Sequence, residues 1–207
     1  LIVRDDPKRH VTAIMTGVDV VGTDGTAAHN LVSARVPAGV LQGAISPKGS
    51  KYGAQVGALE LIGNVTAGAV AAHPAAVLLA LANSKRVGLT QSPKQGNYTR
   101  PSEKDPTADL RAYKARPLNG TWASSPYLHN GSVPTLYDLL LPPAERPKTF
   151  AVGRLGFDPR KVGYVSAGES PFVFDTRQTG NSSAGHEYGV TLSADDRWAL
   201  VEYLKTL

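Results

Sequence analysis

The chain has 207 residues, of which 42% are hydrophobic, and its 22 basic and 17 acidic residues leave a net charge of +5. A chain of this length can bury a sizeable core, in one large domain or in two small ones. It contains no cysteine, which excludes disulfide bonds and thiolate metal sites within these residues. The basic residues are scattered and form no recognised nucleic-acid motif, so we expect a solvated basic surface and no nucleic-acid partner.

The first part of the chain predicts short helices separated by Gly-rich turns. One helix is expected around residues 27–32, with Asp24 or Thr26 as its cap. A second, short helix is expected over residues 59–64, in a weakly periodic region. A third and better one is expected over residues 74–83, where Pro74 suits the first turn.

The longest apolar stretch, residues 67–82, is interrupted by His73 and Pro74. It falls short of the roughly 18 uninterrupted apolar residues that a membrane span needs. We therefore expect a buried helix here and no membrane span. Residues 1–86 are predicted to form one segment with short helices, and the polar, turn-rich residues 87–112 a linker or loop.

The last part of the chain, residues 113–207, contains the clearest helix signals. A short helix is expected at residues 109–114, just before it. Thr135 is expected to cap a helix that Pro142 and Pro143 end, and Ser193 to cap a terminal helix with Asp195 and Asp196 in its first turn. Residues 144–190 alternate turns with short extended pieces. The predicted fold class is mainly α and loop-rich, with long irregular insertions.

The five histidines are the candidate neutral nitrogen ligands, and none lies in a zinc-binding spacing. His10 is expected at the surface, and His29 and His73 are expected to be structural. His186 differs, because it lies in the Gly-rich loop of residues 179–189, where Gly185 allows a bulky planar group to approach the backbone. A histidine offered from such a loop suits axial ligation of iron, and the alternative is a surface histidine with local hydrogen bonds.

The run from Arg116 to Leu136, Arg-Pro-Leu-Asn-Gly-Thr-Trp-Ala-Ser-Ser-Pro-Tyr-Leu-His-Asn-Gly-Ser-Val-Pro-Thr-Leu, places aromatic and basic side chains among turn-forming residues. It resembles the distal loop of di-haem c-type cytochromes of the bacterial cytochrome c peroxidase superfamily, and most closely the rubber oxygenase-like branch. Residues 21–24, 180–189 and 192–207 resemble the same branch, in the same order. The resemblance covers residues 15–40 weakly and residues 113–207 well.

This resemblance implies a cytochrome c-like haem domain, of which residues 113–207 are the C-terminal, haem-embracing segment. It implies that His186 is an axial ligand of a haem c iron, with His129 as second candidate or as a brace of the loop. Arg116 would pair with a haem propionate. Trp122 and Tyr127 would line the haem edge, or alternatively anchor the loop.

The chain departs from the family in lacking the Cys-x-x-Cys-His motif that attaches haem covalently. Three explanations stay open. The chain is part of a larger cytochrome whose haem-attachment portion lies upstream or on a companion chain; it is a haem-free relative that keeps the fold for structural or binding work; or it holds haem non-covalently through His186 and His129. The start Leu-Ile-Val-Arg favours a mature or truncated piece of a longer protein.

The resemblance further implies an oxidoreductase acting in electron transfer and in peroxide or dioxygen chemistry, with its reaction centre in the missing portion. Such proteins are periplasmic or secreted and can work with a small redox protein. The sequence leaves the substrate, the number of haems and the oligomeric state open.

Overall fold

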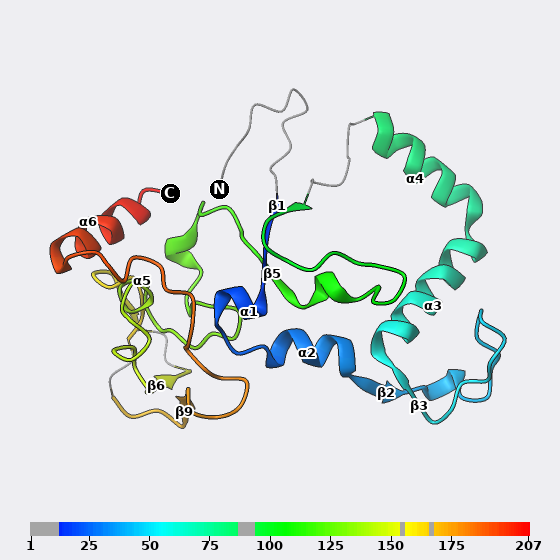
Figure 1. Ribbon diagram of the computed structural model, residues 1–207, viewed down its shortest axis with the longest axis horizontal. Coiled ribbons are helices and arrows are strands. Elements are labelled where there is room, and N and C mark those ends of the chain that lie inside the picture. Colours follow the sequence, from blue (N-terminus) through cyan, green and yellow to red (C-terminus); the bar gives the residue numbers. More distant parts are fainter. Residues whose placement is uncertain (1–12, 87–93, 154–155, 166–167) are drawn as a thin grey trace.

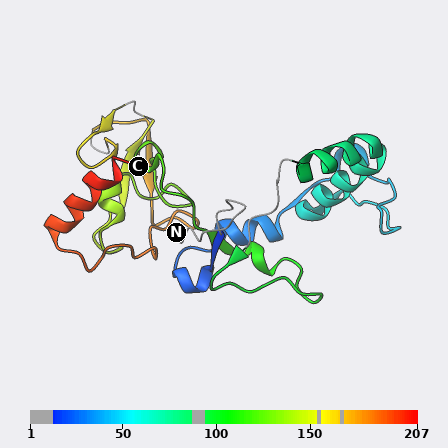
Figure 2. The same ribbon diagram turned by 90° about the horizontal axis from the view of Figure 1, so that it is seen from above.

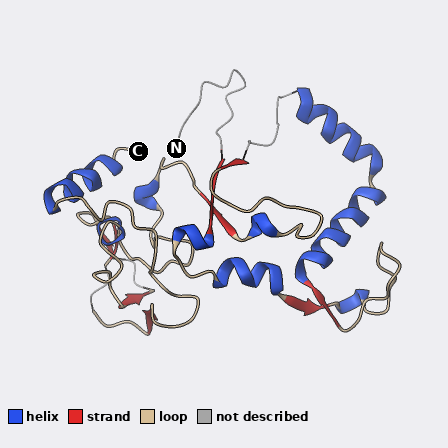
Figure 3. Cartoon of the chain, in the orientation of Figure 1, coloured by secondary structure: helices blue, strands red, loops and turns tan. Residues whose placement is uncertain are grey.

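We describe a computed structural model of the chain, covering residues 13–86, 94–153, 156–165 and 168–207. Helices α3 and α4 lie at one end of the elongated molecule, and α6, β6 and β9 lie at the other (Figures 1 and 2). Strands and helices are short, and much of the chain between them is loop (Figure 3). His10 lies outside the described residues, as do residues 87–93, the first part of the predicted linker.

The fold is not mainly α, and this part of the sequence prediction is wrong. About 34% of the residues are helical and 18% lie in strands, which form several small sheets. The strands include those between α5 and α6, where the short extended pieces expected in residues 144–190 pair with one another. Strand β6, Thr149–Val152, pairs antiparallel with β9, Phe172–Asp175, and β7, Phe157–Asp158, pairs with β8, Gly163–Tyr164.

The central sheet joins the beginning of the described chain to its middle. Strand β1, Ala13–Gly17, lies between β4, Lys94–Gln95, and β5, Ala112–Lys114. Its pairing is parallel with β4 and antiparallel with β5. The short helix expected at residues 109–114 is instead a 3₁₀ turn, η2, Ala108–Leu110, followed by β5. This pairing places Tyr113 opposite Thr16, next to the N-terminal turn, which we define as residues 17–24.

Helix α1, Val18–Val21, follows β1 directly, and α2, Thr26–Ser33, confirms the helix expected at residues 27–32. The N-cap of α2 is Gly25, without a side-chain cap bond, so neither predicted residue occupies the N-cap position. Asp24, just before it, accepts from the backbone N–H of Thr26, the first residue of the helix. Beyond α2, strand β2, Arg35–Pro37, pairs antiparallel with β3, Gln55–Gly57, around the 3₁₀ turn η1, Gly39–Leu41. Tyr52 and Val56 are buried in a small cluster here.

Helices α3, Ala58–Ala72, and α4, Pro74–Arg86, are longer than predicted and largely exposed. The expectation that the apolar stretch 67–82 is buried is therefore wrong: Val70, Leu78 and Leu79 are all exposed. Among the described residues, no single helix is long and apolar enough to cross a membrane. Helix α3 and residues 74–83 pass that test only as a pair, with a bend of 96° between them.

The C-terminal core is built around α5, Leu136–Leu139, and α6, Ala194–Leu204. Both predicted caps are confirmed, since the Thr135 hydroxyl accepts from the N–H of Asp138 and the Ser193 hydroxyl from that of Asp196. The core includes seven buried residues: Tyr127, Val133, Leu136, Leu140, Val162, Val201 and Leu204. The 3₁₀ turn η3, Thr121–Ala123, lies near the C-terminus, because Gly120 N–H donates to the Leu207 carbonyl at 2.9 Å.

Candidate functional site

His129 lies at the tip of a tight loop whose two sides are bonded together. The N–H of Tyr127 donates to the carbonyl of Val133 at 2.7 Å, and the reverse bond is 3.3 Å long. Within the loop, the Asn130 side-chain oxygen accepts from the N–H of Ser132 at 3.2 Å. Tyr127 and Val133 belong to the C-terminal core, so the loop that carries His129 stands on a buried base.

His186 lies in an irregular loop between β9 and α6. This loop packs tightly on the N-terminal turn: the His186 N–H donates to the carbonyl of Val21 at 3.3 Å. At Gly185, where φ is +67°, an added Cβ would lie 2.5 Å from that same carbonyl oxygen. Both the backbone conformation and the close approach require glycine at this position. The sequence predicted that Gly185 allows a bulky planar group to approach the backbone; in the structure the backbone of residues 21–23 approaches it instead.

Arg146 holds the His186 loop from its other side. Its side chain is only 1% exposed, and its guanidinium donates to the carbonyls of Ser183, Gly185 and His186 at 2.5, 2.8 and 2.9 Å. Two further bonds, of 3.0 and 3.2 Å, reach the carbonyls of Leu141 and Leu139 around the end of α5. A buried charge needs such complete hydrogen bonding to be tolerated. Burial lowers the pKa of Arg146 from its ordinary value.

Asn130 and Asp24 join the three segments together. The Asn130 amide donates to the carbonyls of Gly180 and Ser182 at 3.0 and 2.9 Å, so it ties the His129 loop to the His186 loop. The Asp24 carboxylate accepts from the N–H of Gly180 at 2.8 Å, while its backbone carbonyl accepts from the Tyr113 hydroxyl at 3.3 Å. Hydrogen bonds from Thr26 and Gly180 lower the pKa of Asp24.

Four rings meet where these segments converge, and we call them the His–Tyr cluster: Tyr113, His129, His186 and Tyr188. Tyr113 stacks on His129 with ring centres 4.2 Å apart, and the two histidine rings are 5.6 Å apart. Nδ1 of His186 lies 3.1 Å from the Tyr188 hydroxyl, within hydrogen-bonding distance. Nε2 of His186 and both ring nitrogens of His129 are buried and lack a well-formed hydrogen bond to any described residue, although the Asp24 backbone acts as an acceptor that raises the His129 pKa.

Burial shifts both imidazoles toward their neutral form. Burial lowers the pKa of His186 to about 4, and the neighbouring His129 and the Arg146 charge push it in the same direction. Burial also lowers the pKa of His129, and the nearby Asp24 opposes this only in part. A neutral imidazole with an unpaired ring nitrogen is the form that binds a metal ion. Buried polar atoms without partners are uncommon in folded proteins, so these three nitrogens point to a function.

The other predicted site residues lie outside the His–Tyr cluster. Arg116 is exposed and forms no ion pair with any described residue, and the side chain of Trp122 is 46% exposed. Tyr127 is a core residue whose hydroxyl donates to the Thr121 carbonyl at 3.0 Å. Its position matches the alternative role of loop anchor. The structure therefore brings together the two candidate iron ligands, but not Arg116, assigned to a haem propionate, or Trp122 and Tyr127, assigned to the haem edge.

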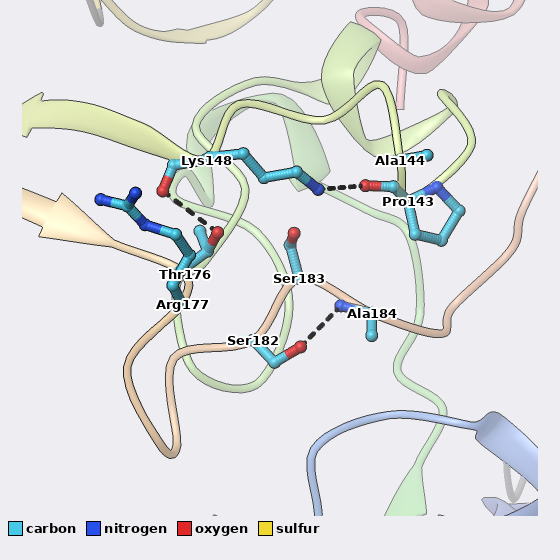
Figure 4. Close-up of a pocket in the computed structure, with 8 residues that line it drawn as sticks. All are labelled: Pro143, Ala144, Lys148, Thr176, Arg177, Ser182, Ser183 and Ala184. Atoms are coloured by element: carbon cyan, nitrogen blue, oxygen red, sulfur yellow. Dashed lines mark hydrogen bonds between the residues drawn. The ribbon is translucent and has the colours of Figure 1, made fainter.

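A surface pocket of about 300 Å³ borders the loop that leads to His186 (Figure 4). Its two charged side chains already have partners: Lys148 donates to the Pro143 carbonyl at 2.9 Å, and Arg177 pairs with Asp175 at 2.8 Å. Neither histidine ring lines it, so we place the candidate site at the His–Tyr cluster and not at this pocket. The lining residues are Pro143, Ala144, Lys148, Thr176, Arg177, Ser182, Ser183 and Ala184.

Sequence reasoning missed the residues that build the site around the histidines. Arg146 and Asn130 carried no motif of their own, and Asp24 was noted only as a possible cap. The available signal was the order of the resembling segments, since residues 21–24, the 116–136 run and residues 180–189 all meet here. Residues so far apart in the chain become neighbours only through the tertiary fold.

Comparison with known proteins identifies the class of this segment. Residues 112–151 match the family model described as RoxA-like, cytochrome c-like. The matched range contains Tyr113, His129 and Arg146, so the chain includes a cytochrome c-like segment related to RoxA. This finding bears out the coarse resemblance to cytochromes. The match covers the His129 loop and ends before the His186 loop.

Two relatives come from Sinorhizobium fredii (strain NBRC 101917 / NGR234). The chain is similar to the uncharacterized protein y4iJ, with 52% identity over 106 residues, which is 46% of this chain and 18% of that protein. It is also similar to the uncharacterized protein y4iM, with 39% identity over 123 residues, 48% of this chain and 28% of that protein. The chain thus spans less than a third of the length of either relative.

Proposed function

We propose that this chain is the C-terminal part of a c-type cytochrome oxidoreductase of the di-haem peroxidase superfamily, and that it supplies His186 as an axial ligand of a haem c. The haem would be attached through a Cys-x-x-Cys-His motif outside these residues. We call the complete protein that carries both parts the parent protein. In it, this chain would take part in electron transfer and in peroxide or dioxygen chemistry.

The observation that carries the proposal is the convergence of three separate segments on two buried imidazoles whose pKa is lowered. The segments resemble one family in the same order, and their contacts position His129 and His186 side by side at 5.6 Å. Nothing in ordinary core packing requires two adjacent histidines with three buried nitrogens that lack hydrogen bonds. The cytochrome c-like match supports haem as the group that such nitrogens serve.

The donor set fits haem iron, while covalent attachment does not fall within this chain. Imidazole nitrogen is a common axial ligand, and haem supplies an iron that exchanges single electrons. The chain has no cysteine, so it cannot form the thioether links itself. Of the two histidines, His186 is the stronger ligand candidate, because its loop is held at the backbone by Arg146 and its Nε2 has no partner among the described residues.

The residues of this chain would perform three tasks. His186 would bind iron through Nε2, and burial would keep it neutral and available over the physiological pH range. The stacked pair Tyr113 and His129 would exclude water from the ligand. Arg146 would hold the loop at a fixed position. The basic surface and the relationship to cytochromes favour a periplasmic or secreted protein with a small redox partner.

One observation favours a second candidate, a haem-free binding or structural protein with a cytochrome-derived fold. The rings of the His–Tyr cluster contact one another: Tyr113 stacks on His129, and the Tyr188 hydroxyl lies within hydrogen-bonding distance of His186 Nδ1. In addition, Arg116 and Trp122 remain at the surface instead of joining a haem pocket. A protein without haem would keep the cluster in this closed arrangement.

An absorbance spectrum of the parent protein, isolated from its natural source, separates the two candidates. Haem ligation predicts an intense Soret band, and its absence from freshly isolated material refutes the haem proposal. Replacing His186 by Ala is expected to change the ligand-sensitive bands of one haem. The matched control is His73→Ala, at an exposed histidine between α3 and α4, which should leave the spectrum unchanged.

A further inference from the structure

Tyr188 is the side chain that meets the second ring nitrogen of His186. Its hydroxyl lies 3.1 Å from Nδ1, and the two ring centres are 5.7 Å apart. The two residues are also bonded through the backbone, where the Tyr188 N–H donates to the His186 carbonyl at 2.8 Å. Tyr188 is 54% exposed overall. The tyrosine therefore reaches from the surface to one defined nitrogen of a buried imidazole.

The two nitrogens of His186 have different surroundings, and this difference determines which one is free. Nδ1 has the Tyr188 hydroxyl, while Nε2 is buried and bonds to no described residue. A neutral imidazole carries one proton. When that proton is on Nδ1, the tyrosine oxygen can accept it as a hydrogen bond, and the lone pair on Nε2 is left for a metal. Such an outer partner fixes the tautomer and the ring orientation of a ligating histidine.

The His186 backbone is held independently of this contact. The Arg146 guanidinium donates to the carbonyls of Gly185 and His186, and the N–H of His186 donates to the carbonyl of Val21. None of these bonds involves the Tyr188 ring. Removing the tyrosine hydroxyl therefore changes the partner of Nδ1 and leaves the loop in place.

We propose that Tyr188 is a positioning residue for the iron ligand: its hydroxyl accepts the hydrogen of His186 Nδ1 and so presents Nε2 to the haem iron. This inference rests on the proposed function, because it assigns a role within the same site. Tyr188 does not touch the iron in this arrangement. It acts through His186, and its effect is on the strength and geometry of the iron–imidazole bond.

The test uses the haem-loaded parent protein and the substitution Tyr188→Phe, which keeps the ring and removes the hydroxyl. Outer partners of metal-bound histidines typically contribute 10- to 100-fold to metal affinity. We expect added imidazole or cyanide to displace His186 from iron at a roughly 10- to 100-fold lower concentration in this variant. Tyr203→Phe, at an exposed tyrosine of α6, is the matched control and should titrate like the wild type.

A second readout tests the tautomer directly. The ¹⁵N chemical shifts of the His186 ring in the reduced haem-loaded protein distinguish a protonated Nδ1 that donates to oxygen from one that does not. Tyr188→Phe should move the Nδ1 signal while the backbone signals of Gly185 and His186 stay in place.

The possible failures can be told apart. A parent protein without a Soret band, or one whose bands ignore His186→Ala, refutes the proposed function. If His186→Ala alters the bands but Tyr188→Phe leaves both the displacement titration and the Nδ1 signal unchanged, the role of Tyr188 is refuted and the proposed function stands. Loss of the Gly185 and His186 backbone signals in Tyr188→Phe would also refute it, because Tyr188 would then hold the loop itself.

Discussion

Replacing Arg146 by Met should destabilise the chain strongly, although it removes a charge that has no ion-pair partner among the described residues. The guanidinium makes five hydrogen bonds, to the carbonyls of Leu139, Leu141, Ser183, Gly185 and His186. Hydrogen bonds to charged groups contribute about 1.5–3 kcal/mol each, so the gross contribution is roughly 7–15 kcal/mol. Burying the guanidinium costs several kcal/mol, which offsets part of this contribution.

The net loss of unfolding free energy should therefore be at least about 3 kcal/mol, because each buried carbonyl left without a partner costs about 1–3 kcal/mol. Urea unfolding followed by circular dichroism measures it. Hydrogen exchange should also quicken in the loop around His186. The control is Arg35→Met, at an exposed arginine with one bond to the Gln55 carbonyl, and it should change stability by less than about 1 kcal/mol. A loss below about 1 kcal/mol for Arg146→Met contradicts the inference that this side chain holds the loop.

Three further predictions concern the same region. The pKa of His186 is about 4 in the folded chain and 6.5 ordinarily, so between these pH values only the unfolded chain is protonated at His186. The free energy of unfolding should therefore fall by about 3 kcal/mol as the pH drops through this window. Urea titrations at several pH values should show a smaller loss in His186→Gln. Gly185→Ala should lower the free energy of unfolding by more than about 2 kcal/mol in a thermal unfolding assay, because the added Cβ meets the Val21 carbonyl. The control Gly22→Ala has a similar φ of +68° but open space around the added Cβ, so it should lower stability by only about 1 kcal/mol. Thr135→Ala should cost about 1–2 kcal/mol in the same assay through loss of a buried cap, and an unchanged midpoint would contradict that role.

Local signals predicted several helix starts, because caps and breakers act within a few residues, but they missed the strand at residues 112–114 and the length of α3. Thr135 and Ser193 both cap helices as expected, and Pro74 begins α4. The strands could not be predicted in the same way. The partners of β6 and β9 are separated by about twenty residues, and those of β1 and β5 by nearly a hundred. Pairing over such separations depends on tertiary contacts, and a few residues of alternating polarity do not specify it.

The sequence named candidate ligands but not the residues that hold their loops in place. His186 and His129 were both candidates from the sequence, but their contact depends on the meeting of two loops. Arg146 follows Glu145 and precedes Pro147, and nothing in that context distinguishes it from a surface arginine. Only its burial to 1% exposure reveals its importance. For α3 and α4 the error was the reverse: their apolar composition suggested that they are buried, and the structure shows that they are largely exposed.

The framework also explains why a loop without regular structure can present a ligand. The bonds that hold the His186 loop go almost entirely to its backbone: Arg146 and Asn130 donate to its carbonyls, and Asp24 accepts from one of its N–H groups. Backbone anchoring of this kind leaves the imidazole free for another partner. It also does not depend on haem, so a descendant that lost the cofactor would keep the same loop. The cytochrome and haem-free proposals therefore share one structure, and the bonding state of Nε2 in His186 is what distinguishes them.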